Sequence, residues 1–176
     1  MSQAKFNKAT IAIHWLVLLL MIVTYCTMEF RGVFERGSDA RETMKSVHYL
    51  FGLTIFFLTF LRVAIRFRFP YPAIEPTPPL WQHKLAALTH LVIYVWLLAL
   101  PLIGWLILSA EGKPIPFWGM ELPALIAENH DTAEALEEIH ELVAKFGYAL
   151  LGFHAIAAIY HHHIVKDNTL LRMKLK

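Results

Sequence analysis

The sequence predicts an all-α protein: an integral membrane four-helix bundle with both termini in the cytoplasm. The first observation is its apolar character. Of the 176 residues, 57% are hydrophobic, and the mean hydropathy is +0.48, higher than in ordinary soluble domains. The second is that four apolar segments are long enough to cross a bilayer, which takes about 20 helical residues. They cover residues 9–30, 47–67, 85–109 and 139–165.

The third observation is the distribution of basic residues. With four spans, both termini and the loop between the second and third segments share one side of the membrane. Ten of the 16 Lys and Arg residues fall there, which leaves six on the other side. Because cytoplasmic loops carry the excess of basic residues, we expect both termini in the cytoplasm. The ten are Lys5, Lys8, Arg62, Arg66, Arg68, Lys84, Lys166, Arg172, Lys174 and Lys176.

The first segment follows Lys5 and Lys8, as the apolar part of a signal peptide would. Its apolar run is too long for that, however, and "CTMEF" at its end offers no small-x-small cleavage site. We therefore interpret it as the first membrane helix. Cys26 in this segment is the only cysteine, so no internal disulfide can form, and no C-x-x-C-H motif is present for covalent haem attachment.

The remaining elements follow in order. The Pro-rich connection between the second and third segments, "RFRFPYPAIEPTPPLWQHK", predicts an extended and stiff cytoplasmic spacer. The loop between the third and fourth segments contains Phe117, Trp118 and Leu122 and is expected to cover the outer end of the bundle. With about half the chain in the spans, residues 1–176 form a single predicted domain whose partner is the lipid bilayer. No nucleotide-binding glycine pattern or nucleic-acid-binding module is present.

Five of the ten histidines fall inside the predicted spans, where an ionisable side chain is costly and marks a functional site by default. They are His14, His48, His90, His140 and His154. The helix directions sort four of them by depth. His48 and His140 lie near the outer surface, and His14 and His154 lie near the cytoplasm. His140 and His154 are 14 residues apart, or ~21 Å along a helix.

The helical phase places further residues beside these histidines. Fourteen residues make two heptads, so His140 and His154 share one helix face, with Gly147 midway between them. Gly52 and Arg62 lie on the face of the second helix that carries its histidine. Glycine lets a flat macrocycle approach a helix closely, and arginine can pair with the carboxylates of such a cofactor.

Two facing imidazoles at each of two depths match bis-histidine ligation of two non-covalent haem b groups, one near each surface. Structural zinc usually takes four ligands, so it explains the pattern less well. A metal-ion transporter with a histidine-lined path remains an alternative, although it does not account for the two levels. The expected iron ligands are His14, His48, His140 and His154, and the expected haem contacts are Gly52, Gly147 and Arg62.

Three stretches also carry a family resemblance: "IHWLVLLLMIVTYCTMEFRG" from Ile13, "HLVIY" with "ALPLIG", and "KDNTLLRM" near the C-terminus. On these residues the chain resembles the bacterial cytochrome b561 family over nearly its whole length. The resemblance implies the same four ligands, two haem b groups and a multi-pass protein of the bacterial inner membrane. It also implies an enzyme, a superoxide oxidase that passes electrons from periplasmic superoxide to ubiquinone.

The wider superfamily includes cytochrome b subunits of hydrogenases and dehydrogenases, so the fold alone does not define the electron donor. The alternative is an electron-transfer subunit that links the quinone pool to a periplasmic redox protein. For the superoxide reaction, Arg31 and Lys45 can attract the anionic substrate toward the outer haem. For the quinone, the candidates at the cytoplasmic level are His90, His161 and Lys166.

Overall fold

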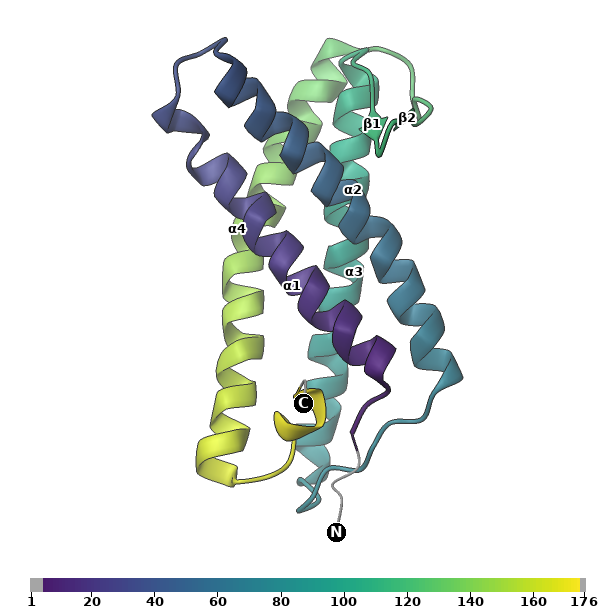
Figure 1. The fold of residues 1–176 in the computed structure, drawn as a ribbon, viewed down its shortest axis with the longest axis vertical. Helices are drawn as coiled ribbons and strands as arrows, with labels where there is room; N and C mark the ends of the chain where they lie inside the picture. The colour runs from purple at the N-terminus through teal and green to yellow at the C-terminus, as the bar shows by residue number, and fades with distance from the viewer. Residues whose placement is uncertain (1–4, 175–176) are drawn as a thin grey trace.

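The structure, a computed structural model, describes residues 5–174, so Lys176 lies outside it. Its main elements are the helices α1 Lys8–Glu29, α2 Asp39–Arg68, α3 Leu80–Ala110 and α4 His130–Tyr160, which pack as a bundle (Figure 1). All four are long and apolar enough to cross a membrane. The predicted four-helix membrane fold is thereby confirmed.

All four helices begin earlier than the hydropathy predicts, and the difference is largest for α2 and α4. α2 begins at residue 39 instead of 47, and α4 begins at residue 130 instead of 139. Each added stretch is polar and starts at a capping residue. The Ser38 hydroxyl accepts a hydrogen bond from the Arg41 amide (3.4 Å), and the Asn129 side chain accepts one from the Thr132 amide (2.8 Å). Hydropathy detects the part of a helix that suits lipid, whereas the caps define where the helix begins.

The helix ends are irregular. After α1 comes a 3-10 turn, η1 Arg31–Val33, and α4 continues into a π-helical turn, η2 His161–Val165. Lys166 ends this turn in a left-handed conformation, with φ of 60°. The chain then reverses into a last 3-10 turn, η3 Leu171–Met173, so the C-terminal tail turns back toward the end of the bundle where α1 begins (Figure 1).

The connection between α3 and α4 contains a small hairpin of β1 Pro116–Phe117 and β2 Met120–Glu121. Its two turn residues, Trp118 and Gly119, both have positive φ (48° and 84°), as tight two-residue hairpin turns require. The Trp118 indole nitrogen donates to the Thr54 hydroxyl of α2 (3.0 Å). The hairpin therefore covers one side of α2 near the end where α4 begins (Figure 1).

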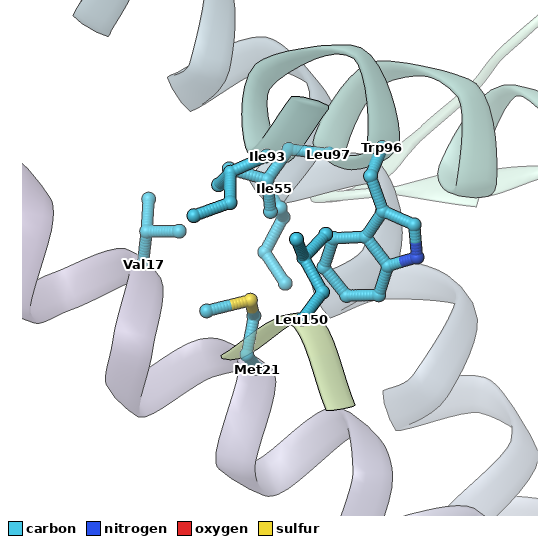
Figure 2. Close-up of a cluster of buried hydrophobic side chains, with 7 residues drawn as sticks. All are labelled: Val17, Met21, Ile55, Ile93, Trp96, Leu97 and Leu150. Carbon is cyan, nitrogen blue, oxygen red and sulfur yellow. The ribbon is translucent and has the colours of Figure 1, made fainter. Parts of the chain in front are cut away.

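The main core cluster lies where all four helices meet (Figure 2). Every helix contributes at least one buried apolar side chain to it, and one of these is the large indole of Trp96, which is only 5% exposed. The cluster consists of Val17, Met21, Ile55, Ile93, Trp96, Leu97 and Leu150. These contacts hold α4 against the other three helices along the middle of its length.

The C-terminal tail binds the Pro-rich connection, so this connection is more than a spacer. Asn168 makes three hydrogen bonds to it. Its amide donates to the Glu75 carbonyl (3.1 Å), its side-chain oxygen accepts from the Glu75 amide (3.1 Å), and its side-chain nitrogen donates to the Ala73 carbonyl (3.3 Å). Arg172 also donates to the Pro72 carbonyl, and its own carbonyl accepts from the Phe6 amide (3.1 Å). Both described ends of the chain therefore lie on one side of the bundle.

We predict that Asn168→Ala weakens this attachment. The substitution removes two side-chain hydrogen bonds at a buried residue, which is expected to lower the free energy of unfolding by about 1–3 kcal/mol. Denaturant titration in detergent measures the change. Thr77→Ala, an exposed substitution in the same connection, is the matched control. Equal stability of the two variants would contradict the prediction.

Candidate haem sites

The outer histidine pair consists of His48 on α2 and His140 on α4. Their rings lie edge to face, with centroids 6.2 Å apart and an interplanar angle of 70°. Nδ1 of His48 lies 3.1 Å from the Thr24 carbonyl of α1. Because a carbonyl only accepts, this nitrogen carries the proton, and the lone pair of Nε2 is left available for a metal.

A pocket lies at this outer pair. Both histidines and Gly52 line it. Gly104 of α3 also contacts this site, because a Cβ added there would approach Cε1 of His140 to 3.3 Å. Sequence reasoning missed Gly104. The available signal was a glycine in the third span, at the end of "ALPLIG".

The inner pair consists of His14 on α1 and His154 on α4, with ring centroids 6.3 Å apart and an interplanar angle of 63°. Arg62 of α2 donates from Nη2 to Nδ1 of His14 (2.9 Å). Its guanidinium also lies 5.3 Å from the ring centre of Tyr94, and its Nε is buried without a partner among the described residues. His90 of α3 lies beside the other member of this pair, with its ring centroid 5.5 Å from that of His154.

In both pairs the spacing of the ring centroids is compatible with one metal between two imidazoles. A metal–imidazole bond is about 2 Å long, and the ring centre lies roughly 1 Å beyond the nitrogen, so two axial rings have centroids roughly 6 Å apart. The measured 6.2 and 6.3 Å agree with this value, whereas the 5.5 Å between His90 and His154 is shorter. Among residues 5–174, no group of three or more His, Cys, Asp or Glu side chains is arranged to hold a bare metal ion.

Gly147 lies between the two pairs, at a close contact of α4 with side chains of α1 and α3. A Cβ on it would be 2.3 Å from Cζ2 of Trp96 and 2.4 Å from the Tyr25 hydroxyl. Both side chains also bond to α4. The Trp96 indole donates to the Val143 carbonyl (2.9 Å), and Tyr25 donates to the Ala144 carbonyl (2.7 Å). This close contact explains why residue 147 is a glycine, which the sequence did not reveal. The contact of Gly147 with a haem stays a prediction.

The two basic residues expected near the outer site differ in their surroundings. Lys45 forms a salt bridge with Glu42 (2.7 Å), which neutralises much of its charge. Arg31 is half-buried at the start of η1 and contacts the Met28 sulfur (3.6 Å). Within the described residues, no carboxylate lies within salt-bridge distance of Arg31, so its charge remains available to an anion.

The three quinone candidates are not all brought together. Nδ1 of His161 lies 2.6 Å from Oδ2 of the buried Asp167. Burial alone would raise the pKa of Asp167, but hydrogen bonds from the Thr169 amide (2.8 Å) and the His161 ring outweigh it, so this pKa lies below its usual value. His90 instead lies beside His154, and Lys166 is exposed at the end of η2. Sequence reasoning did not foresee the His161–Asp167 pair in this form.

We predict that Gly147→Ala destabilises the bundle by about 1–3 kcal/mol, because the added methyl group overlaps Trp96 and Tyr25. The midpoint of thermal unfolding in detergent measures the effect. Gly152→Ala is the matched control, since it lies on the same helix and a methyl group added there would meet no atom within 4 Å. It should be neutral or stabilising because alanine favours helix. A Gly147→Ala variant as stable as Gly152→Ala would contradict the close contact.

Known proteins resemble this chain along almost its full length. The family model for prokaryotic cytochrome b561 matches residues 5–176. Cytochrome b561 homolog 1 of Escherichia coli is 41% identical over 169 residues, which cover 96% of each chain. The probable superoxide oxidase CybB of Yersinia pestis is 40% identical over 98% of this chain and 97% of its own. Together with the four membrane-length helices, these matches show that the chain belongs to the prokaryotic cytochrome b561 family, which implies a multi-pass bacterial membrane cytochrome that binds haem b.

Proposed function

We propose that the chain is a di-haem superoxide:ubiquinone oxidoreductase of the bacterial inner membrane. The observation that carries the proposal is the presence of two histidine pairs whose α4 members are 14 residues apart, each with a ring spacing compatible with one metal between two imidazoles. The likeness to a protein named as a probable superoxide oxidase supports the choice of substrate. Both termini are proposed to lie in the cytoplasm, with His48 and His140 toward the periplasm.

In this proposal His48 and His140 hold the outer haem, and His14 and His154 hold the inner one. When bound, the haem iron supplies reversible one-electron transfer. The Thr24 carbonyl keeps His48 in the tautomer that presents Nε2 to the metal. A metal on Nε2 of His14 requires a proton on Nδ1, which then cannot accept from Arg62. Arg62 is thereby released to pair with a haem carboxylate.

The remaining residues act on the two substrates. Arg31 attracts the superoxide anion to the outer site, where it loses one electron and leaves as dioxygen. Two such electrons and two protons convert one ubiquinone to ubiquinol at the cytoplasmic side. His161, held by Asp167, donates a hydrogen bond to the quinone there. His90, which lies beside His154, and the exposed Lys166 stay separate candidates for quinone contact. Lys45 contributes less to steering because Glu42 neutralises it.

We predict that replacing any one of the four proposed ligands by alanine lowers the haem content from two per chain to one. The haem at the altered pair would lose one of the two imidazoles that hold it, so its retention should fall relative to the haem at the unaltered pair. Pyridine haemochrome spectra and protein quantification measure the ratio. His90→Ala, which changes a histidine at the inner level outside the proposed pairs, should keep both haems. Loss of a haem in His90→Ala together with retention in His14→Ala would contradict the inner assignment.

The reaction itself is tested on the purified protein in nanodiscs. A pulse of superoxide should reduce the haems, and added ubiquinone should reoxidise them. Arg31→Gln should reduce the bimolecular rate of haem reduction by about threefold to tenfold, and added salt should diminish that difference because the effect is electrostatic. Lys45→Gln is the comparison and should have the smaller effect. Haem reduction by ubiquinol, with none by superoxide, would instead support an electron-transfer subunit with a periplasmic partner.

A further inference from the structure

The interval between the two histidine pairs is occupied by the side chain of Trp96. Its indole donates to the carbonyl of Val143, three residues after His140, and lies against Gly147, seven residues before His154. It also lines the outer pocket and packs in the core beside Leu150, one turn before His154 (Figure 2). A single aromatic ring system therefore extends from the outer site toward the inner one.

We propose that Trp96 is the spacer through which the electron passes between the two haems. This inference rests on the proposed di-haem function and assigns a residue to its internal step. With both haems bound, one electron would pass from the reduced outer haem to the oxidised inner haem. No proton or further reactant is needed, and the indole itself remains unoxidised. The rate of such a step falls steeply with every ångström of empty or loosely packed space between donor and acceptor.

The packing between the two histidine pairs is shaped to hold an indole side chain. Gly147 leaves the room that the ring occupies, and the Val143 carbonyl satisfies its only polar group. If this contact served only apolar packing, a leucine facing an alanine would fill it as well as the tryptophan facing the glycine. Tyr25 also contacts Gly147, and its hydroxyl holds α4 through the Ala144 carbonyl. The ring is thus held in one position by contacts from two helices, and its 5% exposure leaves little room for water.

The native Cys26 provides a way to measure this step without superoxide or quinone. It is the only cysteine of the chain, it is exposed, and it lies two residues from Thr24, which contacts the outer pair. A thiol-linked ruthenium photosensitiser at Cys26 can reduce the outer haem of the fully loaded protein with a light flash. Time-resolved absorption then follows the slower equilibration between the two haems.

We expect Trp96→Leu to retain two haems with unchanged low-spin spectra and an unchanged first phase, while the transfer between haems slows at least about tenfold. Trp96→Phe keeps a ring and should stay within about threefold of the wild type. Trp105→Leu is the matched control, because Trp105 lies on the same helix but bonds to the Pro123 carbonyl and packs in the second core cluster. It should leave the transfer rate unchanged.

A Trp96→Leu variant with two haems and a wild-type transfer rate would overturn the spacer role alone. If that variant loses a haem, Trp96→Met replaces it in the comparison. Slow transfer between the haems in Trp96→Met supports the proposal. A wild-type transfer rate in Trp96→Met overturns it. Haem loss in both variants would make Trp96 a support for the haem sites and would also overturn the proposal. A wild-type protein with fewer than two haems would contradict the proposed function itself.

Discussion

The structure depends on the need to partner polar imidazoles inside helices that cross a membrane. A polar side chain in hydrocarbon is costly unless it finds a hydrogen bond or a metal. Here α4 brings His140 and His154 to two partner helices, His140 to α2 and His154 to α1. Because the two positions share a helix face, α4 has to remain in contact with both neighbours along its middle. The rest of the bundle is arranged around that requirement.

The contact at Gly147 is what keeps α4 in this position. Trp96 from α3 and Tyr25 from α1 reach the α4 backbone, and each donates a hydrogen bond to one of its carbonyls. Any side chain at residue 147 would push these two aromatics away. The same contact thus sets the distance between the helices that carry the histidines and fills the space between the two levels. Packing and the proposed electron path depend on one set of side chains.

Much of the fold could be predicted from the sequence because it follows from local patterns. Apolar run length predicts the spans, and a spacing of two heptads places His140 and His154 on one face. The true starts of α2 and α4 were missed, since caps such as Asn129 lie outside the apolar runs. The contact of Trp96 with Gly147, the hydrogen bond from Arg62 to His14 and the attachment of Asn168 to the Pro-rich connection join residues distant in sequence. No periodic pattern reports such contacts.

The most direct test of the central claim is the position of iron in the loaded protein, measured by anomalous scattering from crystals at the iron absorption edge. Two iron atoms per chain are expected, separated by roughly 20 Å, the rise of 14 helical residues. One should lie between His48 and His140 and the other between His14 and His154. A single iron, or an iron bound by His90 in place of His14, would contradict the assignment of two bis-histidine haems.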